Sequence, residues 1–435
     1  MRITPEQAAA RVRAGLGRDP QDALEASVVL EAWGGLTARS ALPLARQVAA
    51  IPRPSSPAGF SRRVTGVVQS ESTREVLGLI ATLLATTAWV APLATALGAG
   101  STERAWKIAL PISLAVQWFL RRRYLTDARG LGRLRTDRGV AAGGTVLSLL
   151  VVVAMLLQPA AALPAALVVT WVGGLLVVVR GWGIPYAACL LAATAAMGLG
   201  LPVVTDVLLV VTLTVAAVAA AIVTCPPSSL APTPWPRSLV AGAIGGTTAL
   251  LIVVDPTVEW SSWRPFPVIA LVPCLLGTVW ASRHLNRIWT VLLAALASTD
   301  FGDRSSRRHR RVFGRIIVGA FGRLVLLTAA VSVLTYALVH SVATSGRGLA
   351  LLLLGLGCFG VVGFVAALLE SFSRLLAAGV VAVVAVVVAA AAASGRLPGP
   401  DLPPLAAAAV AAAVVALWPV ARLVSQPDRT LATMI

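Results

Sequence analysis

Three ionisable residues lie inside or beside long apolar runs, where a charge is costly. Asp206 and Arg323 lie inside such runs, and Arg180 lies in a short turn between two of them. Ionisable residues within a membrane commonly mark a substrate or ion path. We therefore predict Arg323, Asp206 and Arg180 as candidate substrate-binding residues. An arginine that faces a central cavity could meet an anionic phosphate.

Each candidate also has a purely structural interpretation. Asp206 could lie only one turn deep and be solvated. The long side chain of Arg323 could reach the membrane surface, and Arg180 could anchor the topology. His340, which follows Tyr336 near a helix end, is interpreted as a satisfied interface histidine more readily than as a proton relay. Glu370 and Arg374 have the i, i+4 spacing of a local ion pair.

Composition and motifs argue against several functional classes. The 435-residue chain is 57% hydrophobic and 12% charged, with a net charge of +18. Its basic residues cluster where apolar runs end, so they predict membrane topology and no nucleic-acid partner. The four cysteines are scattered singly, which predicts no metal site, cofactor or disulfide framework. HExxH, GxxxxGK[ST] and a GxSxG in a strand-turn-helix setting are absent, so we do not expect an enzyme. No channel filter is evident.

The apolar runs must therefore form the elements that position these residues. A spanning helix needs about 20 apolar residues. The sequence predicts an all-α polytopic membrane protein with about twelve transmembrane helices, since a β-barrel would show short alternating strands. The expected spans are 76–98, 105–120, 140–158, 162–179, 183–200, 202–224, 238–254, 265–282, 316–342, 348–369, 375–394 and 403–422.

The distribution of arginine predicts the orientation. Cytoplasmic loops of membrane proteins carry an excess of Lys and Arg. The most basic segment runs from Ser282 to Arg315, and the loop 121–139 is the next most basic. Both fall inside if the two termini are cytoplasmic. Nearly all basic residues are Arg, and Ala, Val, Leu and Gly dominate, which suggests a GC-rich bacterial genome and therefore a bacterial cytoplasmic membrane. The apolar stripe from Leu285 to Leu296 is interpreted either as an extension of the preceding helix or as a membrane-surface helix.

Four segments are expected along the chain. Residues 1–74 form a cytoplasmic helical arm and linker, 75–224 a first membrane half, 225–237 a proline-rich cytoplasmic connector, and 238–435 a second membrane half. One strongly basic loop in each half suggests two six-helix halves related by duplication. The alternative is that basic loops recur simply because the topology needs them.

Capping signals predict three short helices in the arm. Thr4-Pro5-Glu6-Gln7 is typical of a capping box, and Asp19-Pro20-Gln21-Asp22 starts a second helix in a similar way. A third helix is expected over 37–50. So small a core predicts that the arm leans on cytoplasmic loops or on a protein partner.

One local segment suggests a family. The segment 366–377, Ala-Ala-Leu-Leu-Glu-Ser-Phe-Ser-Arg-Leu-Leu-Ala, places a very short inner turn between two apolar helices. It resembles the corresponding turn of polysaccharide exporters in the multidrug/oligosaccharidyl-lipid/polysaccharide flippase superfamily. The twelve-helix count and internal termini are similar too, whereas the N-terminal arm departs from that family's pattern. The basic loops at 127–133 and 302–304 also resemble part of the major-facilitator pattern, without matching it fully.

Three functions follow as expectations. The first is a transporter that flips or exports a lipid-linked glycan or polysaccharide, with membrane lipids and that glycan as its partners. The second is a major-facilitator-like secondary transporter. The third is a non-transporting scaffold subunit that recruits a cytoplasmic protein through residues 1–74.

Overall fold

The regular elements described by a computed structural model of the chain are all helices. The structure describes residues 4–16, 20, 22–32, 38–50, 77–86, 88–90, 92, 99–125, 130–136, 144, 149, 153, 157, 159–197, 202–225, 234–254, 273–274, 303–340, 346–372, 374–396 and 403–425. The chain divides into two compact units, one holding the first three helices and one holding the helices from residue 77 onward.

The first unit consists of α1 (Pro5–Leu16), α2 (Ala23–Ala32) and α3 (Ala38–Ala50). Their packing buries a small core of short side chains: Ala8, Ala9, Val12, Ala26, Leu30, Ala41, Ala45 and Val48. Alanine buries little area, so this unit gains modest hydrophobic stabilisation for its length. The three helices expected from the sequence are all present.

The helix starts in this unit confirm one capping prediction and correct the other. The Gln7 N–H donates to Thr4 Oγ1 at 3.4 Å, and the Thr4 N–H donates to Gln7 Oε1 at 3.2 Å, which is the reciprocal capping box. The second helix starts later than predicted. Its cap is Asp22, whose Oδ1 accepts the Glu25 N–H at 2.7 Å, because Asp22 directly precedes the first helical residue, Ala23.

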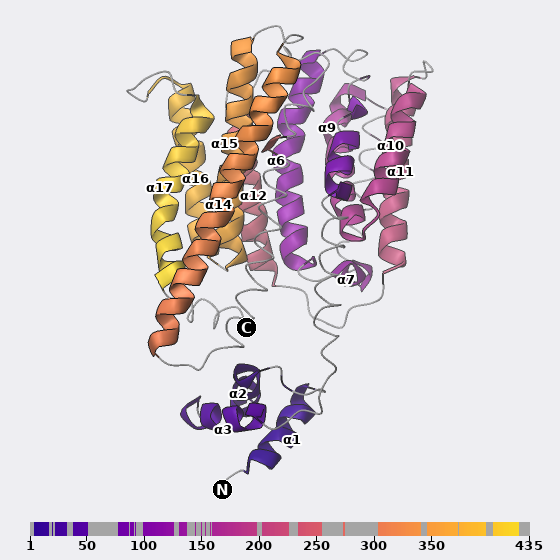
Figure 1. Cartoon of the computed structure of the whole chain (residues 1–435). Coiled ribbons are helices and arrows are strands. Elements are labelled where there is room, and N and C mark those ends of the chain that lie inside the picture. Colours follow the sequence, from indigo (N-terminus) through magenta and orange to yellow (C-terminus); the bar gives the residue numbers. More distant parts are fainter. Residues whose placement is uncertain are drawn as a thin grey trace. The chain divides into compact units, whose positions relative to one another are not determined.

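The second unit is a bundle of long helices (Figure 1). Its described helices are α6 (Ala99–Arg123), α7 (Gly130–Thr136), α9 (Pro159–Val179), α10 (Gly183–Met197), α11 (Val203–Val223), α12 (Trp235–Val254), α14 (Asp303–Val339), α15 (Gly346–Ser371), α16 (Leu375–Ala393) and α17 (Pro404–Ser425). The Leu77–Thr86 segment is a shorter apolar helix. Glycines with positive φ, Gly181 at +83° and Gly395 at +68°, follow the ends of α9 and α16.

Within the described residues, six helices are long and apolar enough to cross a membrane: Val203–Val223, Trp235–Val254, Gly314–Val339, Gly346–Ser371, Leu375–Ala393 and Pro404–Ser425. The class of helical membrane protein is therefore confirmed, whereas twelve spans and a duplication stay predictions. The expected spans 140–158 and 265–282 lie almost wholly outside the described residues, as does the stripe 285–296. Helix α6 covers the expected span 105–120 but adds charges at both of its ends.

The basic segment before the ninth expected span is helical from Asp303, which corrects its interpretation as a loop up to Arg315. Helix α14 includes the arginine cluster and continues to Val339 without a break. Arginine has a high helix propensity, and the segment 303–315 contains no proline, so nothing in its sequence stops the helix at the membrane surface. Arg310, Arg311 and Arg315 are exposed on this extension.

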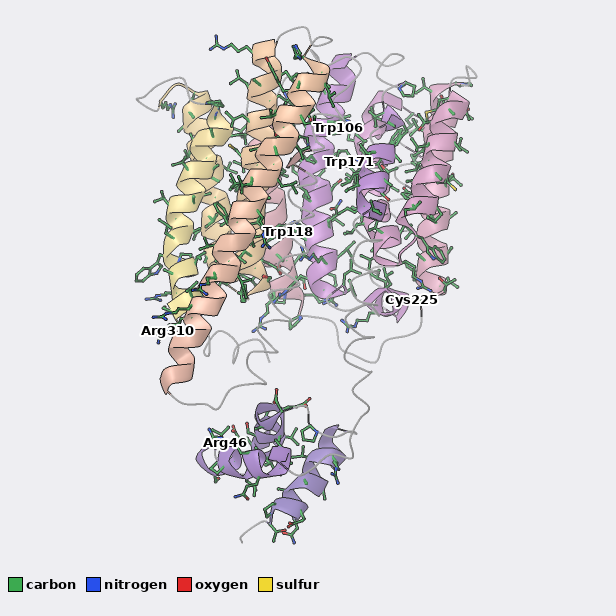
Figure 2. The ribbon with its side chains drawn as sticks, viewed as in Figure 1. Arg46, Trp106, Trp118, Trp171, Cys225 and Arg310 are labelled. Carbon is green, nitrogen blue, oxygen red and sulfur yellow. The ribbon has the colours of Figure 1, made fainter. Side chains whose placement is uncertain are left out.

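Two groups of helices meet where α6 packs against α12. Helices α9, α10 and α11 lie on one side and α15, α16 and α17 on the other, as Figure 1 shows. The first group packs around tryptophans. The rings of Trp106 and Trp171 meet edge to face with centroids 4.9 Å apart (Figure 2), and Trp89 is fully buried beside them.

Glycines allow the close approach of α6 and α12. A Cβ added at Gly245 would lie 2.6 Å from Trp118 Cγ and 2.7 Å from the Leu114 carbonyl oxygen. A Cβ at Gly242 would lie 3.0 Å from the Ala115 carbonyl oxygen. Small residues at helix interfaces are a common device in membranes, where packing replaces the hydrophobic driving force. We call this glycine-lined contact the α6–α12 seam.

One end of the bundle collects most of the described basic side chains. The carboxyl ends of α6, α15 and α17 and the amino ends of α12, α14 and α16 meet there (Figure 1). Its arginines are Arg121, Arg122, Arg123, Arg133, Arg180, Arg237, Arg310, Arg311, Arg315, Arg374 and Arg422. We call this the basic end. The opposite end carries Glu103, Arg104, Lys107, Arg347 and Arg396.

Candidate functional site

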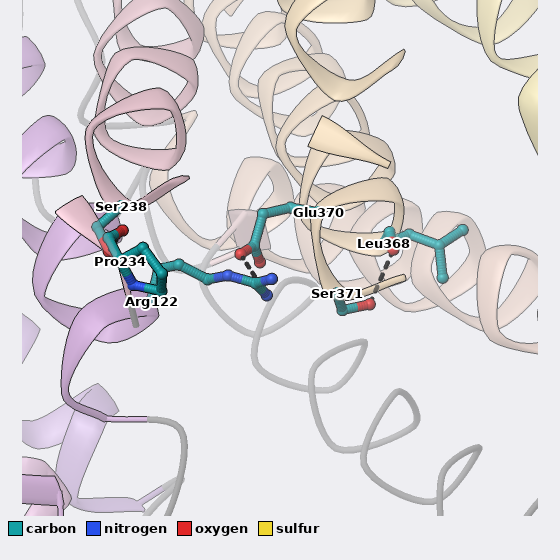
Figure 3. Close-up of polar contacts among 6 residues, drawn as sticks. All are labelled: Arg122, Pro234, Ser238, Leu368, Glu370 and Ser371. Atoms are coloured by element: carbon teal, nitrogen blue, oxygen red, sulfur yellow. Dashed lines mark hydrogen bonds and ion pairs between the residues drawn. The ribbon is translucent and has the colours of Figure 1, made fainter. Parts of the chain in front are cut away.

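An ion pair joins the two groups of helices at the basic end. Arg122 Nη1 lies 3.2 Å from Glu370 Oε1, which links the carboxyl ends of α6 and α15 (Figure 3). The Arg122 side chain is 18% exposed and that of Glu370 is 9% exposed. Two nearby serines make other bonds, since Ser371 Oγ donates to the Leu368 carbonyl and Ser238 Oγ to the Pro234 carbonyl.

This pair replaces the local one that the sequence suggested. Glu370 pairs with an arginine far away in the sequence, and Arg374 is exposed at the start of α16. The helix ends after Ser371, so Glu370 and Arg374 do not share a continuous helical face, which the i, i+4 geometry requires.

A second arginine links α6 to α12 at the same level. The Arg123 guanidinium lies 4.1 Å from the centroid of the Trp235 ring, and its Nε donates to the Tyr124 hydroxyl at 2.9 Å. Arg123 is only 6% exposed. A desolvated cation over tryptophan is attracted by the ring's negative face. Arg122, Arg123, Tyr124, Trp235 and Glu370 together form what we call the bridging cluster.

The bridging cluster can act as an ionic contact between the two groups. A buried ion pair gains Coulomb attraction but loses hydration, so its net contribution to stability is small while the loss of one partner is costly. An anion arriving at the basic end could take over the place of the Glu370 carboxylate on Arg122, since guanidinium binds carboxylate and phosphate in similar geometry. The cluster therefore combines a contact between groups with a possible anion site.

Arg180 ends α9 in a tight turn. The Gly181 N–H donates to the Val178 carbonyl at 2.8 Å and the Trp182 N–H to the Val177 carbonyl at 3.1 Å, which is the Schellman pattern. Arg180 Nη2 donates to the Thr224 carbonyl at 3.4 Å, and its guanidinium lies 5.6 Å from the Trp182 ring centroid. Its Nε is buried with no hydrogen-bond partner in the described part of the chain.

Asp206 lies in the first turn of α11, as the sequence predicted, but it is buried. It is 5% exposed, and its Oδ1 has no hydrogen-bond partner within the described residues. A carboxylate in the first helical turn is favoured by the helix dipole. Its burial favours a packed side chain over a solvated one, and its role in substrate binding stays a prediction.

Arg323 lies on α14 two turns beyond Arg315 and is exposed on the surface of the bundle. That exposure agrees with a side chain that extends toward the membrane surface. His340, just past the end of the same helix, contacts the Ala337 carbonyl through Nδ1 at 3.0 Å and stacks on Tyr336. These contacts fit the satisfied interface histidine.

The three predicted residues do not come together. Asp206 is 18 positions before Thr224 on α11, so about 27 Å of helix separates it from Arg180. Arg323 is on α14, which packs against α15 and α17 and not among α9, α10 and α11.

Sequence reasoning missed the bridging cluster. The signal available in the sequence was Glu370, an acidic residue between two apolar runs in an expected inner turn.

Groups of three or more residues able to hold a metal ion do not occur among the described residues. Comparisons with known proteins do not assign the chain to a family. No family model, no curated protein and no solved structure matches it. The resemblance to polysaccharide exporters thus stays a prediction.

Proposed function

We propose that the chain is a multi-pass membrane transporter that flips or exports a lipid-linked glycan or polysaccharide. The bundle of apolar helices and the basic end support this class. The observation that carries the proposal is the Arg122–Glu370 pair, because it joins two groups of helices that would move apart if the protein opened toward its basic end.

In this proposal the basic end faces the cytoplasm and the pair closes it. A phosphate-bearing lipid headgroup would displace Glu370 from Arg122, and the released groups would then rock about the α6–α12 seam. Asp206, near the other end of the bundle, would meet a cation or polar substrate group there. Arg323 is a weaker candidate than Arg122 for binding the phosphate, since its side chain is exposed on the surface of α14.

The test measures the amount of surface polymer and the pool of lipid-linked precursor in cells that naturally produce this protein. Deletion of the gene should remove the polymer and accumulate the precursor. Arg122→Gln should do the same at normal protein level, whereas Glu370→Gln, which keeps the cation, should retain measurable export. Arg422→Gln is the matched control, since the Arg422 side chain is exposed on α17 and lies over Trp418. Unchanged polymer and precursor pools after deletion would exclude the proposal.

The first unit favours a second candidate, a scaffold subunit. Helices α1–α3 enclose their own core and form a separate compact unit. Such a unit could recruit a cytoplasmic protein. Deletion of residues 1–50 discriminates, because a transporter should keep exporting without them and a scaffold should lose its partner. Loss of export in that deletion, with the membrane unit still folded, would favour the scaffold.

A further inference from the structure

An apolar groove opens beside Arg180 between α9, α10 and α11. Its volume is about 400 Å³, and it is lined by Val177, Trp182, Pro185, Tyr186, Cys189, Leu213 and Ala217. The tyrosine hydroxyl does not make the lining polar, because it is bonded to Thr214 Oγ1 at 2.8 Å. Such a lining offers a water molecule no hydrogen-bond partners, whereas it can accommodate a hydrocarbon chain.

A cation lies next to one end of the groove. Trp182 lines the groove, and the Arg180 guanidinium lies 5.6 Å from the Trp182 ring centroid, so this cation is adjacent to the groove on its Trp182 side. Leading away from it, Pro185 and Cys189 extend the apolar wall along α10, about 9 Å from Gly183 to Cys189. An apolar channel of this kind with a positive end matches a molecule that has a hydrocarbon chain and an anionic head.

We propose that this groove binds one anionic phospholipid, with an acyl chain between α10 and α11 and the phosphate on Arg180. The Thr224 carbonyl engages one Nη2 hydrogen at 3.4 Å, while Nε has no partner in the described chain and no acidic side chain pairs with Arg180 there. Basic pockets between membrane helices at the cytoplasmic side recognise lipid headgroups in this way. Trp182 belongs at the same level, where tryptophans anchor to headgroups.

The other role open to Arg180 is to cap the carboxyl end of α11 through the Thr224 carbonyl. A capping arginine would stabilise the bundle in any bilayer. A lipid site would make the protein distinguish anionic from zwitterionic lipid. The site does not depend on what the protein transports, so it stands or fails separately from the proposed function.

The experiment measures lipids that remain bound to the full-length protein. The protein is extracted from bilayers of equal parts phosphatidylglycerol and phosphatidylcholine, and the retained lipids are counted by native mass spectrometry. Wild type should retain phosphatidylglycerol about fivefold over phosphatidylcholine, the preference expected from one cation near an anionic headgroup. Arg180→Gln should bring the ratio to parity.

Two further variants complete the design. Arg422→Gln removes another arginine beside a tryptophan at the basic end, and it should keep the wild-type ratio. Ala217→Phe fills the groove with Arg180 intact and should lower phosphatidylglycerol retention, so it tests the site even if Arg180→Gln fails to fold. An unchanged ratio in Arg180→Gln or Ala217→Phe, or an equal fall in Arg422→Gln, would overturn the site.

Discussion

At the scale of single residues, the informative charges are those that the fold buries. Glu370 and Arg123 are each at least nine-tenths buried, although charged residues are seldom buried unless they are paired. Each contacts a residue on another helix: Glu370 pairs with Arg122 on α6, and Arg123 lies over Trp235 on α12. The exposed arginines of the basic end, such as Arg310, can instead be explained by topology alone.

Removal of one partner of the buried pair should therefore be costly. Glu370→Gln leaves the Arg122 charge without its carboxylate, and we expect a loss of about 3 kcal/mol in the free energy of unfolding. Thermal unfolding of the purified protein in detergent measures this loss of stability. The double substitution Arg122→Gln with Glu370→Gln should recover part of the loss, since the Arg122 charge is removed together with the carboxylate.

The control for that prediction is the Glu103–Lys107 pair, whose atoms are 2.7 Å apart on the face of α6. That pair has i, i+4 spacing and more exposed side chains. Glu103→Gln should change stability by less than about 0.5 kcal/mol. Equal losses at Glu103 and Glu370 would mean that the bridging pair is no more than a surface contact.

At the scale of helices, the α6–α12 seam depends on the absence of side chains. Gly245→Ala would place a methyl group against Trp118 and the Leu114 carbonyl, so the two backbones must separate. We expect a loss of about 1–2 kcal/mol in unfolding free energy despite the better helix propensity of alanine.

Gly363→Ala in α15 is the matched substitution, because a Cβ there meets nothing within 4 Å. It should be neutral or slightly stabilising in the same thermal unfolding assay. If the two variants behave alike, the close approach of α6 and α12 is not what these glycines provide.

In the first unit, the start of α2 should depend on Asp22. Asp22→Ala removes the acceptor of the Glu25 N–H and should destabilise α2 by about 1 kcal/mol. Hydrogen exchange of peptides from residues 1–50 in the full-length protein would show faster exchange in α2. Gln47→Ala, at an exposed position of α3, should leave exchange unchanged. If α2 exchanges no faster in the Asp22 variant than in the wild-type protein, Asp22 is not the residue that caps α2.

Elements set by local signals could be predicted from the sequence. Helix α9 ends at Val179 as expected, because Gly181 allows the tight turn, and α16 nearly matches its expected range 375–394. Pairings between distant segments could not be predicted. Nothing in a single sequence says that Glu370 faces Arg122 in preference to Arg374, since that choice depends on how α6 and α15 pack.

At the scale of the whole membrane unit, the basic end is what connects geometry with proposed function. The arginine excess predicts that this end is cytoplasmic, and there it would meet phosphate-bearing lipid before translocation. Asp206 and Arg396 would then face the outside. The bridging cluster, the lipid groove and the export proposal all take their orientation from this assignment.

Accessibility of single cysteines from the two sides of intact cells tests that assignment most directly. In a chain whose four native cysteines are replaced by serine, Arg310→Cys and Arg396→Cys put an exposed thiol at opposite ends of the membrane unit. A membrane-impermeant maleimide should label the thiol at 396 in intact cells and the thiol at 310 only after permeabilisation. Labelling of position 310 in intact cells would contradict the orientation on which these proposals depend.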